Sequence, residues 1–492
     1  MTKSGKVAPR SAQELKLSET GLYADRVRVY PRSVHGPART FKWSVLVFCL
    51  TVYYTLPWVR WDRGPGQPNQ AVLLDIGHER FRFFNIEFWP QDIYYLTGAL
   101  ILGAVSLFLV TSLVGRVWCG YACPQTIWTD LFMWIERRVE GDRNERMKRD
   151  QGPTTFAKIW RKAAKHGAWL GIAFWTGGAW IMYYADAPTV TRQFWAGTAA
   201  SPVYIFTFLF TATTYVLAGW AREQVCTYMC PWPRFQAAML DEHSLIVTYQ
   251  GWRGEPRGHG KRVPDAPTKL GDCVDCNACV HVCPTGIDIR DGVQLECINC
   301  GLCVDACNDI MVRTGSPKWL ITWDTLAHQK ARATGQYDRF HMFRPRTLIY
   351  ASALTIVFGI MVVAMANRTQ IDLAVQRDRA PLFVTVRDGS LRNGYTVKIS
   401  NKTQEAADFV LSTAGVDGAG MSVAEETEGH QPLLTLPVEA DSVGTFRVLV
   451  FARPNRLIDG SQDITFALRN TVTGEKTTYH SVFMGPGGRA TH

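Results

Sequence analysis

No cysteine follows residue 307 in this 492-residue chain, so no disulfide can form within its last third. The sequence also contains no P-loop and no G-x-G-x-x-G fingerprint, which are the common nucleotide- and dinucleotide-binding loops. No convincing Ser-His-Asp arrangement is present either. The chain therefore shows no nucleotide or nicotinamide site of its own. What it carries instead is 13 cysteines, all before residue 308, and several long apolar runs.

Eight of the 13 cysteines lie within residues 273–307, in two runs of the form C-x2-C-x2-C-x3-C. This is the spacing of bacterial ferredoxins with two 4Fe–4S clusters, in which the fourth cysteine of each run serves the other cluster. The predicted ligands of the first cluster are Cys273, Cys276, Cys279 and Cys307. Those of the second cluster are Cys297, Cys300, Cys303 and Cys283. Structural zinc favours two separated pairs of ligands, and disulfides need an oxidising compartment, so both fit this pattern poorly.

Five apolar runs approach the roughly 20 residues that a helix needs to cross a bilayer. They are residues 41–59, 93–114, 168–185, 203–220 and 347–366. The first run follows some 40 residues and has no convincing cleavage site, so we interpret it as a span and not as a signal peptide. The sequence thus predicts a five-span α-helical bundle in the lipid bilayer.

The distribution of Lys and Arg predicts the orientation of these spans. Basic residues crowd the N-terminal tail and the connection between the second and third predicted spans, whereas residues 186–202 hold only Arg192. We expect the N-terminus and residues 221–346 in the cytoplasm and the C-terminal domain in the periplasm of a bacterial inner membrane. The net charge of +10 is interpreted as positive-inside loops on an anionic leaflet, not as a nucleic-acid site.

Short alternating runs replace the long apolar ones after about residue 381. Seven such runs, separated by turn residues, predict an all-β immunoglobulin-like sandwich, although the cysteine pair of antibody domains is missing. The expected fold is therefore a multi-domain chain. Its parts are a tail (1–40), a four-span domain (41–249), a linker (250–270), a two-cluster ferredoxin-like domain (271–310), a basic return segment (311–346), a fifth span (347–366) and the β domain (381–488).

The motif C-x-Y-x-C-P occurs twice, once after the second predicted span and once after the fourth. One copy is Cys119 to Pro124 and the other is Cys226 to Pro231. The two-span units look like parallel repeats, which would bring both motifs to the cytoplasmic membrane face. A four-residue offset places both thiols on one helix face, and a helix N-terminus favours the thiolate. Cys119, Cys123, Cys226 and Cys230 are therefore candidate copper or redox thiols.

Several alternatives stay open for these four thiols. Thiolates select Cu(I), but the spacing does not distinguish copper from another metal, from a reversible disulfide or from buried packing thiols. Cys49 is interpreted as an inert apolar residue of the first span. Four residues near the motifs are interpreted as ordinary packing residues: His243, Met229, Met239 and Met133. The aspartates of the cluster loop, Asp305 among them, are interpreted as a solvated acidic surface.

In this order, the motifs resemble those of the CcoG family, also called RdxA or FixG, which are accessory proteins of cbb(3)-type cytochrome c oxidase. The resemblance covers almost the whole chain and rests on both C-x-Y-x-C-P motifs, the ferredoxin runs from Cys273 to Cys307 and the C-terminal β domain. It implies an oxidoreductase with cupric reductase activity, which takes electrons from a cytoplasmic donor. Its Cu(I) would pass to copper chaperones or oxidase assembly factors. No oligomeric state is predicted.

Two further hypotheses are kept beside cupric reduction. The first is an electron-relay subunit of a membrane quinol dehydrogenase, since such subunits share the four-span bundle, C-x-x-x-C-P motifs and a double-cluster ferredoxin. The fifth span and the exported β domain argue against it. The second is a non-enzymatic copper-binding scaffold whose clusters only stabilise the fold. It predicts clusters that do not respond to Cu(II).

Overall fold

The computed structural model describes residues 28–64, 67–259, 270–403, 405–424, 430–453 and 460–486. Residues 1–27 of the expected tail and 260–269 of the expected linker lie outside them. The chain divides into two compact units, Met1–Met361 and Val362–His492. Each unit is described by itself.

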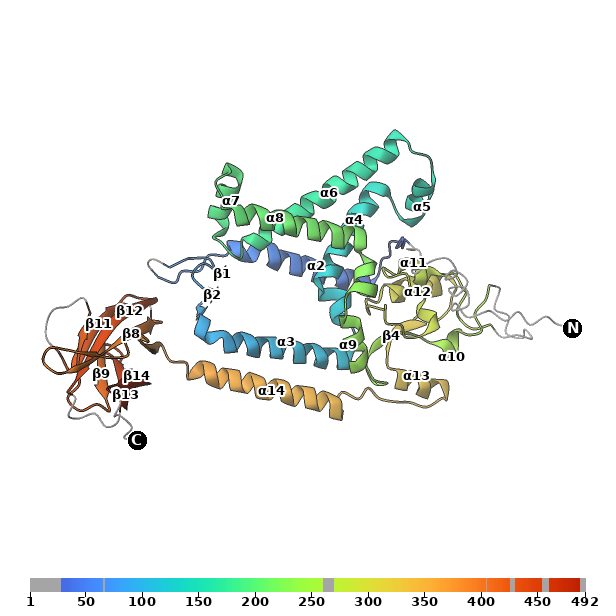
Figure 1. Ribbon diagram of the computed structural model, residues 1–492. Coiled ribbons are helices and arrows are strands. Elements are labelled where there is room, and N and C mark those ends of the chain that lie inside the picture. Colours follow the sequence, from blue (N-terminus) through green and yellow to red (C-terminus); the bar gives the residue numbers. More distant parts are fainter. Residues whose placement is uncertain are drawn as a thin grey trace, which may run out of the picture. The chain divides into compact units, whose positions relative to one another are not determined.

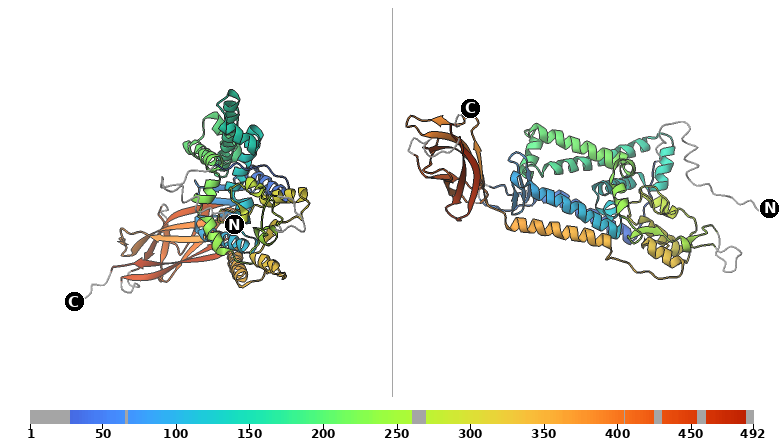
Figure 2. Two further views of the ribbon diagram at one scale, coloured as in Figure 1. Left: turned by 90° about the vertical axis from the view of Figure 1, so that its right-hand side faces the viewer. Right: turned by 60° about the horizontal axis from the view of Figure 1, so that its bottom comes forward.

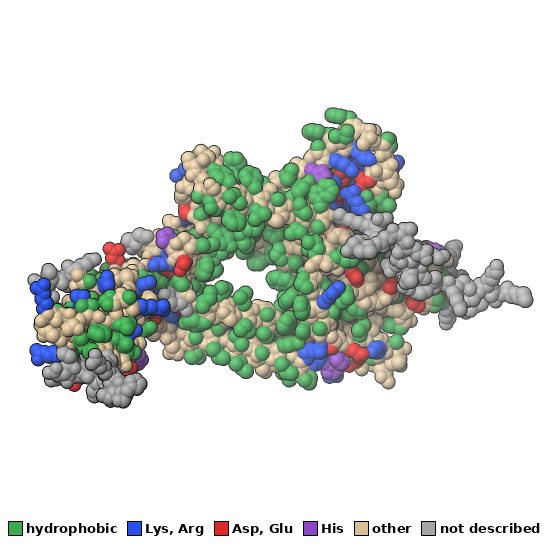
Figure 3. All heavy atoms as spheres, viewed as in Figure 1, with side chains coloured by type: hydrophobic (Ala, Val, Ile, Leu, Met, Phe, Trp, Pro, Cys, Tyr) green, Lys and Arg blue, Asp and Glu red, His purple; other side chains and the backbone are tan. Residues whose placement is uncertain are grey.

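Long helices running side by side form the frame of the first unit (Figures 1 and 2). They are α2 (Pro37–Thr55), α3 (Ile93–Val114), α6 (Phe156–Ile181), α8 (Ser201–Thr214) with its continuation η4 (Tyr215–Ala221), and α14 (Pro345–Ala366). Among the residues that the structure describes, three helices are long and apolar enough to cross a membrane: Ile93–Val114, Ser201–Ala221 and Pro345–Ala366. Hydrophobic side chains cover their surfaces (Figure 3), as lipid-facing helices require.

The other two predicted spans, 41–59 and 168–185, fall on α2 and α6 but do not reach the same hydropathy. Both helices begin with basic turns: α2 carries Arg39 and Lys42, and α6 carries four Lys and Arg residues between positions 158 and 165. The five-span topology therefore remains a prediction. Helix α14 packs on α3 at Gly98, where a Cβ would lie 2.5 Å from the sulfur of Met361.

Shorter elements complete the helical part of the first unit. A three-stranded antiparallel sheet follows α2, and helices α4, α5 and α7 connect the long helices. These elements are β1 (Val72–Asp75), β2 (Arg80–Phe83), β3 (Ile86–Phe88), α4 (Pro124–Glu140), α5 (Arg143–Gln151), α7 (Ala187–Ala196) and α9 (Trp232–Met239).

The cysteine-rich domain is larger than the expected 271–310. Strand β4 (Ile246–Tyr249) pairs antiparallel with β5 (Ile321–Asp324), and both pack on the helices that carry the cysteines. The helices that carry the cysteines are α11 (Ala278–Val282) and α12 (Leu302–Arg313). Two other short helices lie next to the strands in sequence: α10 (Gly251–Gly254) and α13 (Leu326–Ala333). The expected linker and return segment each contain part of this domain. Two four-residue strands about 70 residues apart are too short to give a periodic signal.

The second unit is a sandwich of two antiparallel sheets, as predicted. One sheet has the order β10-β12-β8-β6, with β7 beside β8, and the other has the order β11-β9-β13-β14. The strands are β6 (Ile371–Arg377), β7 (Val384–Thr385), β8 (Leu391–Asn401), β9 (Ala407–Ala414), β10 (Gly420–Val423), β11 (Leu433–Val438), β12 (Ser442–Ala452), β13 (Ser461–Asn470) and β14 (Lys476–Met484). Inward side chains such as Phe409 and Phe466 are fully buried between the sheets.

The expected start of this domain at residue 381 is wrong. Strand β6 already alternates, with Ile371, Leu373 and Val375 buried in the core. It follows α14 after only four residues, 367–370, so no long turn separates the strand from the apolar helix. For that reason the sequence pattern did not separate strand β6 from the end of α14.

A buried carboxylate holds the helices α4, α5 and α6 and the end of η4 together. Glu136 contacts Arg222 at 2.6 Å, Arg146 at 2.7 Å and Lys165 at 3.5 Å, and its side chain is 1% exposed. Burial raises the pKa of Glu136, but Arg222, Arg146 and Lys165 outweigh this effect and hold its pKa below the ordinary value. The carboxylate stays ionised because three cations surround it.

Replacing Glu136 by Gln should lower the free energy of unfolding by about 3–5 kcal/mol, because it leaves several cations buried without a counter-charge. Since the pKa of Glu136 is below 4.5, its contribution is complete above about pH 4.5 and is lost as the pH falls further. Denaturant unfolding of the purified protein in detergent measures both effects.

The matched control is Asp309→Asn. Asp309 pairs with Arg313 at 2.8 Å on the surface, with the two side chains 54% and 69% exposed, so its loss should cost less than about 1 kcal/mol. Equal destabilisation by the two variants would contradict the role assigned to Glu136.

Candidate redox centre

The eight clustered cysteines line two neighbouring cavities. One cavity is lined by Cys283, Cys297, Cys300 and Cys303, together with Cys279 and apolar side chains. The other is lined by Cys273, Cys276, Cys279 and Cys307. Each cavity thus receives three cysteines from one run and the last cysteine of the other run. The assignment of individual thiols to cluster iron remains a prediction, but the donor set fits it.

Residues in the left-handed backbone conformation shape each three-cysteine loop in the same way. The residues on either side of the middle cysteine have positive φ: Asp275 and Asn277 around Cys276 in the first run, and Asn299 and Gly301 around Cys300 in the second. Asn, Asp and Gly adopt this conformation most readily. These residues turn the chain around each cavity, so that a C-x2-C-x2-C run presents three thiols to one centre.

Four or more cysteines line each cavity, and this donor set suits a 4Fe–4S cluster. Burial raises the pKa of Cys279, Cys297 and Cys307 to about 12, so these thiols are protonated without iron. Cluster binding must therefore release protons.

Each C-x-Y-x-C-P motif folds as one wide π-turn. The turns are η3 (Trp118–Ala122) and η5 (Val225–Met229), closed by bonds from Cys123 N–H to the Trp118 carbonyl (2.9 Å) and from Cys230 N–H to the Val225 carbonyl (2.8 Å). The expectation that both thiols share one helix face is wrong in detail. Cys123 and Cys230 are extended, with ψ of 128° and 122°, because a following proline disfavours helical geometry.

The first motif packs directly on the second cysteine run. A Cβ on Gly120 would lie 2.6 Å from the Ile298 carbonyl oxygen and 3.1 Å from the Cα of Cys300. Tyr121, which is 6% exposed, donates its hydroxyl to the Cys300 carbonyl at 3.0 Å. Cys119 contacts the same apolar cluster as Cys300. The π-turn therefore lies against the backbone of one predicted cluster ligand.

The four thiols of the two motifs lie near enough to one another to interact electrostatically. The thiols of Cys123, Cys119 and Cys230 all raise the pKa of Cys226 through electrostatic interaction, and burial, the largest cause, takes it to about 12. Burial likewise raises the pKa of Cys119 to about 11. A helix N-terminus does not make these two groups thiolates, so a metal or an oxidant would have to displace their protons.

The two motifs differ in their surroundings. Tyr121 is buried on the cysteine-rich domain, whereas the equivalent Tyr228 is 78% exposed and Cys230 is also exposed. The sequence repeat does not reveal this difference, because equivalent residues of the two motifs contact different parts of the structure. Cys119 lies against the predicted cluster site, and Cys230 opens to the outside of the first unit.

Two side chains that the sequence did not assign to this centre help to position it. Gln236 of α9 accepts the thiol hydrogen of Cys119 at 3.0 Å, and it also accepts from Arg116. Asp305 is not part of a solvated surface. It is 5% exposed and accepts the N–H groups of Ala38 and Arg39 at the start of α2. A capping carboxylate that is 266 residues away in sequence gives no local signal.

Replacing Gly120 by Ala should push the π-turn away from the Cys300 loop, since the new methyl group meets backbone on two sides. We expect a loss of about 1–3 kcal/mol of stability and an altered EPR spectrum of the reduced, cluster-loaded protein. Gly103→Ala is the control, because a Cβ at Gly103 meets nothing within 4 Å. If both variants keep the parent spectrum and stability, the close approach of Gly120 to Cys300 is not real.

Three family models match the chain. A 4Fe-4S dicluster domain matches residues 221–326, a 4Fe-4S binding domain matches residues 96–140, and the Ig-like fold at the C-terminus of FixG matches residues 361–486. The first match begins and ends well outside 271–310, in agreement with the β4–β5 pairing. The second covers a segment whose cysteines are Cys119 and Cys123.

Three of the curated relatives match over most of both chains. The nitrogen fixation protein FixG of Rhizobium meliloti is 45% identical over 95% of this chain and 94% of its own. Protein RdxB of Cereibacter sphaeroides is 44% identical over 95% and 98%, and protein RdxA of the same organism is 46% identical over 88% and 90%. This chain therefore belongs to the FixG/RdxA family of iron–sulfur electron-transfer proteins.

Proposed function

We propose that this chain reduces Cu(II) to Cu(I) at the membrane for the copper centre of a cbb(3)-type cytochrome c oxidase. Two 4Fe–4S clusters, held by the eight cysteines from Cys273 to Cys307, would supply the electrons one at a time. Cys119, Cys123, Cys226 and Cys230 would receive the copper ion. Copper is the substrate here, and the reaction adds one electron to Cu(II) without breaking a bond in the protein.

The proposed topology has five spans, α2, α3, α6, α8 and α14. The N-terminus and the ferredoxin-like domain face the cytoplasm, and the β domain faces the periplasm. The basic residues of the tail and of α5 and the start of α6 support this orientation through the positive-inside rule. A cytoplasmic donor would deliver the electrons, and copper chaperones or oxidase assembly factors would accept the Cu(I).

One observation carries the proposal: the π-turn of the first motif lies on the Cys300 loop. Cys119 contacts the apolar cluster that contains Cys300, and the Tyr121 hydroxyl is bound to the Cys300 carbonyl. An electron would therefore have a short path from the second cluster site to the four thiols. Sulfur ligands hold Cu(I) in preference to harder ions, which favours the reduced product at this place.

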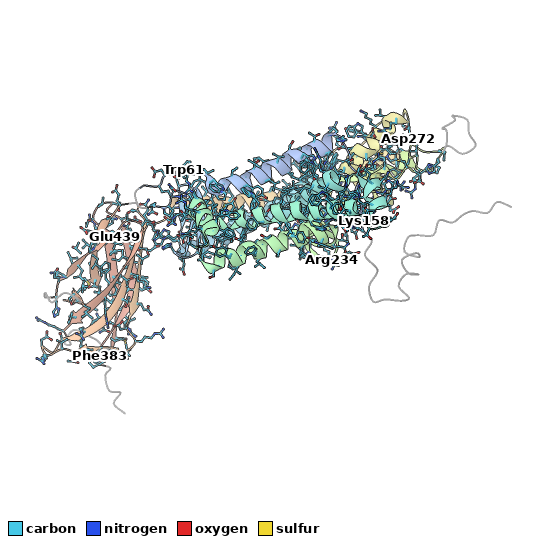
Figure 4. All side chains as sticks on the ribbon, turned by 90° about the horizontal axis from the view of Figure 1, so that it is seen from above. Trp61, Lys158, Arg234, Asp272, Phe383 and Glu439 are labelled. Carbon is cyan, nitrogen blue, oxygen red and sulfur yellow. The ribbon has the colours of Figure 1, made fainter. Side chains whose placement is uncertain are left out.

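Quinol oxidation is the second candidate, and one cavity bears on it. An apolar cavity of about 280 Å³ lies among Trp58, Phe174, Trp195 and neighbouring side chains of α6, α7 and α8. Trp58, which lines the cavity, is three residues from Trp61 in the sequence. Trp61 lies at the opposite end of the first unit from Asp272, the residue before Cys273 (Figure 4). Arg39 lies against the cysteine-rich domain, because its N–H bonds to Asp305. Trp58 follows Arg39 by 19 residues of largely helical chain, which span about 28 Å. A quinol in this cavity would be far from the clusters, so the observation favours copper reduction.

Serine substitutions in the two motifs test the proposal against the scaffold hypothesis. Cys119→Ser and Cys226→Ser should lower the rate of Cu(I) formation by at least about 10-fold while the cluster absorbance stays unchanged. The reduced protein is mixed with Cu(II), and a Cu(I)-specific chelator reports the product. Cys49→Ser is the matched control, since Cys49 lies in α2 among neither set of thiols.

Two other results would count against the proposal. Unchanged Cu(I) formation in both serine variants would remove the four thiols from the reaction. Loss of iron from either variant would show that these cysteines bind an iron–sulfur cluster themselves, and iron analysis beside the copper assay detects it.

A further inference from the structure

Two histidines and an aspartate from distant parts of the sequence meet beside the start of α14. His243 lies between α9 and β4, and Asp338 and His341 lie between α13 and α14. One ligand atom from each of these three side chains lies within 4.8 Å of the other two. It is the one such group of metal-ligating side chains in the described parts of the chain, and it contains no cysteine.

The three side chains contact one another directly. His341 Nδ1 lies 3.7 Å from Asp338 Oδ1, and the rings of His243 and His341 are 5.1 Å apart and meet edge to face. The Nδ1 atom of His243 is buried and has no hydrogen-bond partner among the described residues. A buried imidazole nitrogen without a partner is costly, and an ion bound to this nitrogen would satisfy it.

The backbone around the site is held before any ion binds. Asp241 accepts the N–H of His243 at 2.9 Å and also pairs with Arg344. Arg346 donates to the carbonyls of Met239 and Leu240 at the end of α9. These bonds fasten the segment before α14 to the loop after α9, so the three ligands do not depend on an ion to bring them together.

We propose that His243, Asp338 and His341 bind a divalent transition-metal ion such as Zn²⁺, Ni²⁺ or Cu²⁺. Imidazole and carboxylate ligands suit these ions, whereas Cu(I) prefers sulfur. Three protein ligands leave at least one position for water or an exchanging ligand. His341 is exposed and Asp338 is half-buried, so an ion can enter from solvent. The site goes beyond the proposed function, because it requires neither the clusters nor the four thiols.

An ordinary His–Asp pair elsewhere in the same segment shows what such a contact looks like without a third ligand. His328 Nδ1 lies 2.6 Å from Asp324 Oδ1, and its other nitrogen accepts from Arg332 at 3.0 Å. Both ring nitrogens of His328 therefore have hydrogen-bond partners. His328 belongs to no group of three metal-ligating side chains in the described parts of the chain. His328→Ala is a matched control for the three proposed ligands.

Zinc binding to the full-length, cluster-loaded protein in detergent tests the site. After dialysis against Zn²⁺, metal analysis should find at least one zinc ion per chain, and zinc X-ray absorption should show nitrogen and oxygen ligands with imidazole scattering. His243→Ala and His341→Ala should each weaken zinc binding at least about 10-fold, with the iron content unchanged. His328→Ala should bind zinc like the parent.

Three results would overturn the proposal. They are the absence of retained zinc in the parent protein, a zinc shell of sulfur without imidazole scattering, and equal weakening by His328→Ala. The absorption spectrum of the parent protein identifies the ligands without any variant, so a variant that fails to fold does not leave the question open. Failure of this site would leave copper reduction by the four thiols untouched, because the two experiments involve different residues.

Discussion

The close packing of one π-turn on one cysteine loop is the constraint on which the redox centre depends. Gly120 has room for no side chain beyond hydrogen, because the Ile298 carbonyl and the Cys300 backbone lie against it. The proline after Cys123 keeps that residue extended, and the π-turn ends there. Together they place Cys119 in the apolar cluster that contains Cys300. Separation of these two elements would leave two unrelated groups of thiols.

Buried charges keep the cysteine-rich domain and the long helices in this arrangement. Asp305 of α12 caps the start of α2, and Arg39 of the same helix pairs with the buried Asp130 of α4 at 2.8 Å. Lone buried charges are expensive, so each link holds only while both partners are in place. Such links keep the cysteine-rich domain from sliding along the helices. Cys119 therefore keeps its place beside the Cys300 loop.

The sequence predicted those features that have local signals. The cysteine spacing predicted two mixed sets of four thiols, and cysteines of both runs line each of the two cavities. The alternating runs predicted the sandwich. Pairing of β4 with β5, capping by Asp305 and the contact of Gly120 with Cys300 all join residues far apart in sequence, and no local pattern encodes them. The meeting of His243 with His341 has the same character: neither histidine has a motif, and only the fold brings them together.

Electron counting in a single turnover tests the central claim most directly. The protein is fully reduced, freed of reductant and mixed anaerobically with excess Cu(II), and the EPR signal of the reduced clusters is followed beside the yield of Cu(I). Our account predicts loss of the cluster signal with one Cu(I) formed for each electron lost. Reduced clusters that persist in the presence of Cu(II), with no Cu(I) formed, would contradict it.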